Sequence, residues 1–189
     1  MKKKIILAIL PISIVLILIY LISDNKLYYY GESRVNIFKH NLPLNLEPNY
    51  WDSDYCIPII GFVIEYNKTV FIGKEVEYNY LNDTIVVNEI IRYGFNHDTL
   101  IAQIEDTKGE NYYIECVRSK TNRIQENVLD KTVSIDTVAY NWVEIKSNKA
   151  IKLRRVQGYT LLLLIILIPL IILGSFILKK AKKANQENM

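Results

Sequence analysis

The chain of 189 residues is poor in the residue types that most often carry chemistry, with only two cysteines and two histidines. Charge is also missing from two long runs, residues 5–23 and 159–178, although it is frequent between them. This composition excludes an ordinary soluble globule, a disordered chain and a transporter with many membrane spans. About 130 residues separate the two runs, enough for one modest hydrophobic core and too few for two.

The scarcity of histidine argues against a metal site. Any such site would have to recruit His40, His97, Cys56 and Cys116, and no two of these lie at a ligand spacing from one another. The chain also has no P-loop and no glycine fingerprint of a dinucleotide-binding fold. We therefore expect no metal and no cofactor.

The sequence has no nucleophile elbow of the G-x-S-x-G type and no comparable catalytic motif. His97 and Asp98 are adjacent and lie near several hydroxyl side chains, which leaves an envelope enzyme or a ligand sensor centred on this pair as an alternative. Histidine is also common in turns, where unusual backbone angles are tolerated. We expect that the protein is not an enzyme.

Each uncharged run is long enough to cross a membrane. A helix rises about 1.5 Å per residue and a bilayer core is about 30 Å thick, so roughly 20 apolar residues are needed. We predict transmembrane helices over residues 5–23 and 158–178. A cleavable leader is the alternative for the first run, but its apolar stretch is too long and lacks a small-residue cleavage site.

Short lysine-rich flanks predict the orientation. Lysines occupy positions 2 to 4 and recur just after position 178, and such short basic flanks stay in the cytoplasm. The tails 1–4 and 179–189 are therefore predicted to be cytoplasmic, and residues 24–157 to form an extracytoplasmic domain. Cleavage of the first run would leave that domain on the same side. The predicted location is the cell (inner or plasma) membrane, crossed twice.

The predicted outer domain is acidic, with a basic segment next to the second span. Residues 24–145 contain 11 Lys and Arg against 19 Asp and Glu, a net charge of 11 − 19 = −8, which disfavours nucleic-acid binding. Basic residues then cluster before the second span, and we expect contact with lipid headgroups from Lys149, Lys152, Arg154 and Arg155. These side chains could instead simply stay hydrated.

Between the spans, short alternating segments are separated by turn residues every 8–12 positions, which indicates β-strands. Strands are expected over 57–66, 70–72, 76–80, 84–93, 100–105 and 112–118. Sequential strands with short turns favour an antiparallel meander or a small barrel. The predicted fold class is α+β: a β-rich meander with a short helix, flanked by two transmembrane helices.

Three segments fit this pattern less well. Residues 119–131 place Ile124 and Val128 four apart behind the potential caps Ser119 and Thr121, which predicts the short helix. Residues 133–145 fit neither period cleanly, and we favour a strand. Residues 41–49 contain two prolines and are expected to be irregular.

Cys56 and Cys116 both fall in the predicted outer domain. An even pair of cysteines in an oxidising compartment favours one disulfide, and closing a loop of about 60 residues would stabilise the fold by about 4 kcal/mol. Two buried thiols are the alternative. A redox-active pair is disfavoured because no C-x-x-C motif is present.

Aromatic residues are the best candidates for a binding surface. The chain has 14 tyrosines, and Tyr50, Trp51 and Tyr55 form a compact cluster. Tyrosine and tryptophan make efficient contact surfaces because they bury a large area at small entropic cost. We predict an interaction surface at these three residues, although cross-strand packing accounts for many aromatics in a sheet.

One segment resembles a known group of proteins. Tyr93-Gly94-Phe95-Asn96-His97-Asp98, then Leu100-Ile101-Ala102 and Tyr112-Tyr113-Ile114 after a turn, is similar to a hairpin pattern in small uncharacterised envelope proteins of bacteria. The similarity covers residues 93–114, 22 of the 189 residues. It implies a bacterial envelope location and carries over no catalytic or binding residue. The two flanking spans differ from the single leader usual in that group.

These observations predict a membrane-anchored, extracytoplasmic interaction module. Its partners would be membrane lipid and another envelope protein or complex, and not nucleic acid. An immunity or protection protein at the envelope would use the same architecture. The enzyme or ligand sensor centred on His97 and Asp98 is the competing class.

Overall fold

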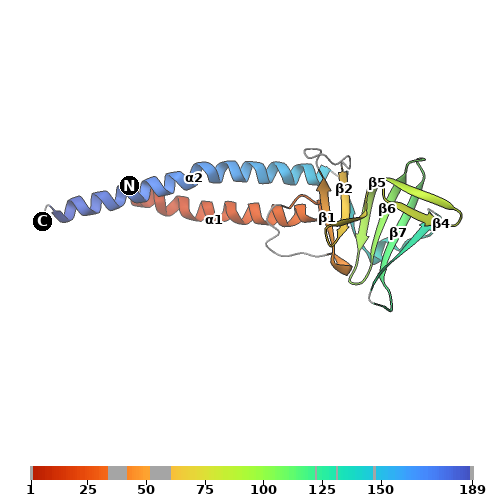
Figure 1. Cartoon of the computed structure of the whole chain (residues 1–189). Helices are drawn as coiled ribbons and strands as arrows, with labels where there is room; N and C mark the ends of the chain where they lie inside the picture. Colours follow the sequence, from red (N-terminus) through yellow and green to blue (C-terminus); the bar gives the residue numbers. More distant parts are fainter. Residues whose placement is uncertain are drawn as a thin grey trace.

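The computed structural model describes residues 2–33, 42–51, 61–121, 123–130, 132–146 and 148–187. Two long helices, α1 (Lys2–Leu27) and α2 (Asn148–Glu187), lie side by side and carry a β domain at one end (Figure 1). Both chain termini lie at the opposite end. The structure is therefore a two-helix stalk with one domain at its tip.

The stalk exposes apolar side chains along most of its length. Most large hydrophobic residues of both helices, from Leu10 to Ile22 and from Ile151 to Ile177, are exposed to a third or more of their surface. Two helical segments, Leu10–Tyr30 and Asn148–Ile177, are long and apolar enough to cross a membrane by length and composition.

The β domain contains nine strands and three short 3-10 helices among the described residues. The 3-10 helices are η1 (Tyr28–Tyr30), η2 (Pro43–Asn45) and η3 (Thr137–Ala139). The strands are β1 (Leu46–Trp51), β2 (Gly61–Tyr66), β3 (Thr69–Ile72), β4 (Glu77–Tyr80), β5 (Asp83–Phe95), β6 (Leu100–Asp106), β7 (Asn111–Arg118), β8 (Ile124–Asp130) and β9 (Asn141–Glu144).

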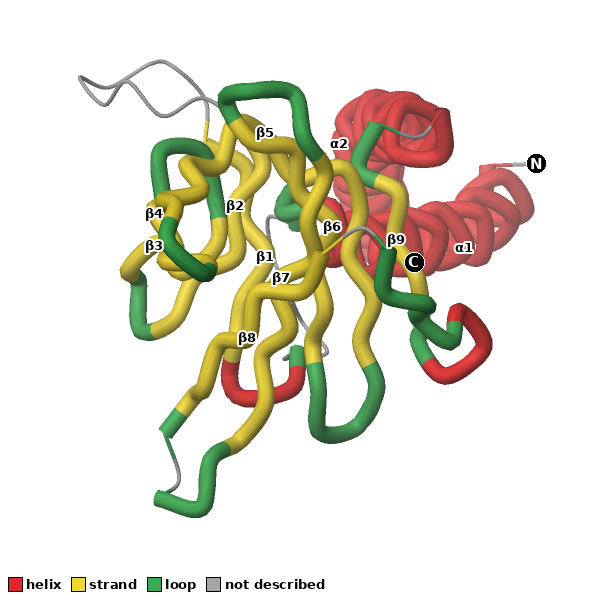
Figure 2. Tube along the Cα trace, turned by 90° about the vertical axis from the view of Figure 1, so that its right-hand side faces the viewer, coloured by secondary structure: helices red, strands yellow, loops and turns green. Residues whose placement is uncertain are grey.

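All strand pairs are antiparallel. One sheet has the order β1-β2-β3, and the other has the order β4-β5-β6-β7-β8, with β9 pairing with the second half of β5. Because β4 also approaches β8, the larger sheet nearly closes on itself. Figure 2 shows these strands in front of the two helices. The predicted antiparallel α+β architecture is confirmed.

The core lies between the two sheets and is built from alternating strand positions. Ile64 and Ile72 face inward from the smaller sheet, and Ile104 and Ile114 from the larger one, all without exposed surface. Tyr93 is also fully buried, and its ring stacks on Phe62 with centroids 5.5 Å apart. Burying such side chains supplies the main drive for folding the domain.

The helix predicted over 119–131 is wrong. Ile124–Asp130 forms strand β8, which pairs with β7 along its whole length, from Arg118–Ile124 to Tyr112–Asp130. A spacing of four places Ile124 and Val128 on one face of a strand as well as of a helix, so their spacing could not separate the two. Ser119, expected as a helix cap, instead joins the turn, where its backbone N–H donates to the carbonyl of Arg123 at 2.8 Å.

Two other segments differ in detail from expectation. Residues 46–49, which we expected to be irregular, belong to strand β1 (Leu46–Trp51). Pro48 is tolerated in this strand because β1 lies at the edge of its sheet and pairs with β2 alone. Residues 133–145, for which we favoured a strand, contain helix η3 followed by strand β9. Residues 57–60, the start of another predicted strand, lie outside the described residues.

Candidate interaction site at the junction of stalk and sheet

A tight turn connects the stalk to the β domain. Helix α1 ends at Leu27, η1 follows, and Gly31 then adopts a left-handed backbone with φ +70°. A side chain at Gly31 would lie 2.6 Å from the backbone nitrogen of Tyr50. That nitrogen donates to the carbonyl of Gly31 at 3.1 Å. Glycine is therefore required by both its conformation and the close approach of β1.

A second contact joins the same turn to the large sheet. The buried hydroxyl of Tyr93 in β5 donates to the backbone carbonyl of Tyr29 at 2.6 Å. The ring of Tyr29 also stacks on Phe95, with centroids 5.5 Å apart. Residues 64 positions apart in sequence are thereby held together, so the domain is attached to the stalk at several points and not by a free linker.

A cavity with a volume of about 570 Å³ lies at this junction. Its wall combines η1, the two sheets and the first turns of α2. The lining residues are Tyr30, Glu32, Tyr50, Gly61, Phe62, Lys74, Asn88, Glu89, Ile90, Ile145, Lys146, Ala150, Ile151 and Arg154. The wall therefore combines aromatic and aliphatic groups with five charged side chains.

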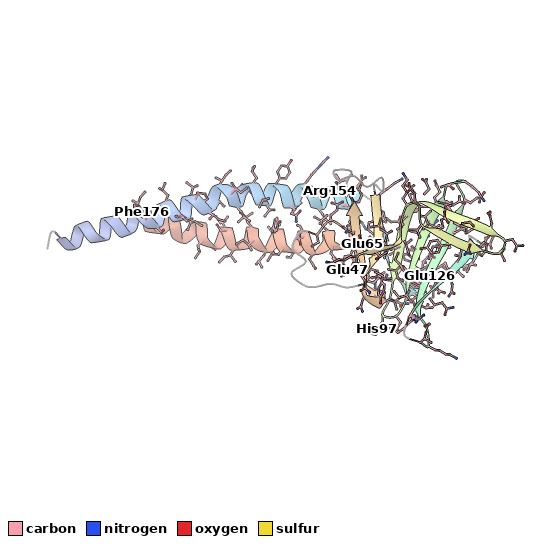
Figure 3. All side chains as sticks on the ribbon, viewed as in Figure 1. Glu47, Glu65, His97, Glu126, Arg154 and Phe176 are labelled. Atoms are coloured by element: carbon pink, nitrogen blue, oxygen red, sulfur yellow. The ribbon has the colours of Figure 1, made fainter. Side chains whose placement is uncertain are left out.

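Two ion pairs hold the charged wall of the junction cavity. Arg154 Nε lies 2.9 Å from Glu32 Oε2, and Lys146 Nζ lies 2.6 Å from Glu89 Oε2. Burial raises the pKa of the Glu32 carboxyl above its usual value, and the Arg154 guanidinium opposes that shift only in part. Figure 3 shows Arg154 at the domain end of the stalk and Phe176 towards the other end.

The basic residues predicted to contact headgroups occupy different faces of α2. Arg154 lines the junction cavity, while Lys149 and Lys152 line a second, smaller cavity. Arg155 is exposed and lines neither of them. With 3.6 residues per turn, positions 149 and 152 share one face, and position 154 points elsewhere. The predicted basic segment is therefore divided into two surfaces, and its contact with lipid stays a prediction.

Only part of the predicted aromatic surface lies within the residues that the structure describes. Tyr50 is 46% exposed and lines the junction cavity. The backbone of Trp51 ends strand β1, and Tyr55 lies outside the described residues. The structure therefore places one of the three predicted residues at a cavity, and the contribution of the other two stays a prediction.

His97 and Asp98 lie in the turn between β5 and β6. His97 Nδ1 is 2.8 Å from Asp98 Oδ1, and their side chains are 97% and 84% exposed. Asn96 Oδ1 accepts hydrogen bonds from the backbone N–H groups of Asp98 and Thr99, at 3.0 and 2.9 Å, which stabilises the turn. Figure 3 shows His97 at the edge of the domain, and it lines neither the junction cavity nor the second, smaller cavity.

Cys116 is fully buried in the core and forms no disulfide with another described residue, and burial raises the pKa of its thiol well above the usual value. Cys56 and His40 lie outside the described residues, so the disulfide stays a prediction. Within the described part of the chain, no group of three His, Cys, Asp or Glu residues could hold a metal ion.

Sequence reasoning missed three contributors to the junction. Glu32 and Lys74 carry no recognisable motif, and their place at the cavity depends on how η1 and the small sheet fold back on α2. Lys26 lines the second cavity together with Lys149 and Lys152. Its position three residues beyond the first uncharged run was the one available signal, because flanking lysines often lie at the headgroup level.

Comparison of the chain with protein-family models, with curated proteins and with solved structures finds no match. The function has therefore to be inferred from the chain's own residues. The junction combines an open cavity, an exposed aromatic ring and two apolar helices, and these features together restrict what it can bind.

Proposed function

We propose that this protein is a membrane-anchored interaction module that binds another envelope protein at the junction cavity. In this proposal α1 and α2 cross the cell membrane, both termini are cytoplasmic and the β domain lies outside. The exposed apolar surface of the stalk supports the anchor, because in water such a surface would drive aggregation.

The observation that carries the proposal is the position of Tyr50. Its half-exposed ring lines a cavity of about 570 Å³ whose wall includes Arg154. Arg154 precedes Gly158, where the apolar part of α2 begins, by four residues or about 6 Å of helix. A partner that reaches Tyr50 must therefore come close to the lipid surface, which favours a protein of the same membrane.

The polar wall of the cavity gives this surface specificity. The wall carries Lys74, Lys146 and Arg154 together with Glu32 and Glu89, so a partner needs a matching arrangement of charge and not only an apolar patch. The His97–Asp98 pair has less support as a functional centre. An exposed turn supplies neither desolvation nor a positioned third group, both of which catalytic pairs use.

The test is site-specific photocrosslinking in cells with the full chain. A photoreactive amino acid replaces Tyr50, and Val138, which is 92% exposed on η3, serves as the control position. We expect a discrete adduct with one membrane protein from position 50 and none from position 138. Lys74→Glu should weaken the adduct by reversing a charge of the cavity wall, whereas His97→Ala should leave it unchanged.

The opposite pattern would contradict the proposal. Absence of an adduct at position 50, together with a small molecule that copurifies with the protein and is lost on His97→Ala, would favour the ligand sensor. A protease added outside the cells provides the check on orientation. It should cleave the β domain and leave both tails intact.

A further inference from the structure

A second cavity of about 390 Å³ lies between the end of α1 and the start of α2. Its lining includes Lys26, Tyr29, Tyr30, Lys149, Lys152 and Leu153. Two of the lysines come from α2 and one from α1, so packing of the helices is what brings them to one cavity. We call this cavity the lysine cavity.

The three lysines differ from Lys146 and Arg154 in having no acidic partner among the described residues. Lys146 pairs with Glu89 and Arg154 with Glu32, whereas no ion pair of Lys26, Lys149 or Lys152 occurs among the described residues. All three are exposed. Three uncompensated cations at one cavity favour an anionic ligand that offers several oxygen atoms.

An apolar surface continues from the lysine cavity down the stalk. Ile22 lies four residues before Lys26, and Val156 lies four residues after Lys152, so each occupies the same helix face one turn further from the β domain. Ile22 and Val156 are 53% and 43% exposed. The order along the stalk is thus cationic, then apolar, which matches a phospholipid from its phosphate to its acyl chains.

We propose that the lysine cavity binds the phosphate of one anionic phospholipid, whose acyl chains lie against Ile22 and Val156. The inference rests on the proposed membrane anchor and adds a defined lipid site to it. Lysines that simply extend towards the headgroups would be spread around the stalk. Here lysines of two helices surround one cavity with aromatic walls, and a single headgroup can contact all of them.

The test measures lipid retention by the full chain. The protein is reconstituted in nanodiscs of equal parts phosphatidylglycerol and phosphatidylcholine, extracted in mild detergent and analysed by native mass spectrometry. We expect one retained phosphatidylglycerol per chain. The triple variant Lys26→Gln, Lys149→Gln, Lys152→Gln should lower its occupancy roughly tenfold, because all three lysine contacts with the anionic headgroup are lost.

The matched control removes the same charge elsewhere. Lys68, Lys120 and Arg123 are exposed on turns of the β domain, and replacing all three by glutamine should leave retention unchanged. An equal loss in this control would show a diffuse electrostatic effect and overturn the site. Equal retention of phosphatidylcholine would do the same, since it would mean that the apolar surface alone holds the lipid.

Three further readouts distinguish the ways in which the proposals could fail. Inorganic phosphate added during extraction should not displace the lipid, and its displacement would assign the cavity to a free anion instead. Carbonate extraction reports the anchor: release of the wild-type chain from membranes would overturn the anchor and the lipid site together. Crosslinking from position 50 should survive in the triple variant. Absence of that adduct from the wild-type chain, with lipid retention intact, would contradict the proposed protein partner and leave the lipid site in place.

Discussion

Gln157 of α2 donates a hydrogen bond from Nε2 to Oδ1 of Asp24 in α1 at 2.9 Å, across 133 positions of sequence. Both residues are buried between the helices, with 8% and 2% of their surface exposed. The other carboxyl oxygen of Asp24 accepts a hydrogen bond from Ser33 Oγ at 2.7 Å. A buried carboxyl group needs such donors, because leaving water without them is costly.

Gln157→Leu should therefore destabilise the helix pair. The substitution keeps the residue's bulk but removes a donor from a buried acceptor, and we expect the free energy of unfolding to fall by about 1–3 kcal/mol. The measurement is denaturant unfolding of the detergent-solubilised full chain, followed by circular dichroism. Tyr159→Leu, on an exposed position two residues further on, is the control and should have little effect.

The double variant Asp24→Leu, Gln157→Leu tests the reason for that loss. Replacing both buried polar partners by apolar groups removes the unsatisfied acceptor, so the double variant should be more stable than Gln157→Leu alone. Additive losses from the two substitutions would mean that the hydrogen bond is not what couples these positions.

Gly31→Ala should disturb the junction between stalk and domain. An alanine there would adopt a strained positive φ and would collide with the backbone of β1, so we expect a loss of at least about 2 kcal/mol. Gly158→Ala is the matched control because an added Cβ meets no atom within 4 Å at that helical position. It should be neutral or stabilising by about 0.5–1 kcal/mol. Thermal unfolding of both variants checks the difference.

Glu32→Gln should alter how stability depends on pH. The pKa of Glu32 is raised on folding, so the folded chain binds the proton more tightly and loses stability as the pH rises above the usual value of 4.5. The variant lacks this loss. The midpoint of thermal unfolding of the variant, measured relative to that of the wild-type chain, should therefore increase from pH 4 to neutral pH. Thermal unfolding of both chains at several pH values measures this difference. A difference that shrinks as the pH rises would mean that the ion pair with Arg154 outweighs burial.

Cys116 should resist alkylation while the domain is folded. Its thiol is fully buried and its pKa is raised, so little reactive thiolate reaches solvent. In a Cys56→Ser chain, maleimide should label it at least about a hundredfold more slowly than in denaturant. Val138→Cys in the same background is the exposed control and should react rapidly in the folded chain. Similar rates at both positions would contradict the described core.

The predicted disulfide has a simpler test. A bridge between Cys56 and Cys116 would cause a mobility shift on reduction of the otherwise wild-type chain, and the shift should disappear in Cys56→Ser. No shift in the wild-type chain would leave Cys116 as a buried thiol, which behaves as a small apolar residue.

Much of the secondary structure follows from local pattern. Alternation of apolar residues located the strands from β2 to β7, although β2 and the first half of β6 bury residues on both faces. The same reasoning failed at Ile124 and Val128, whose even spacing suits a strand as well as a helix. Only the partner strand β7, which supplies the hydrogen bonds, selects the strand there.

The sequence by itself determined that two apolar helices flank one acidic, antiparallel β domain along the chain, because charge, hydropathy and turn residues are local properties. Tertiary structure alone decided which distant groups meet: Asp24 with Gln157, Glu32 with Arg154, and Lys26 with Lys149 and Lys152. Those contacts depend on how two helices at opposite ends of the chain pack together, and short-range pattern carries no information about their relative rotation.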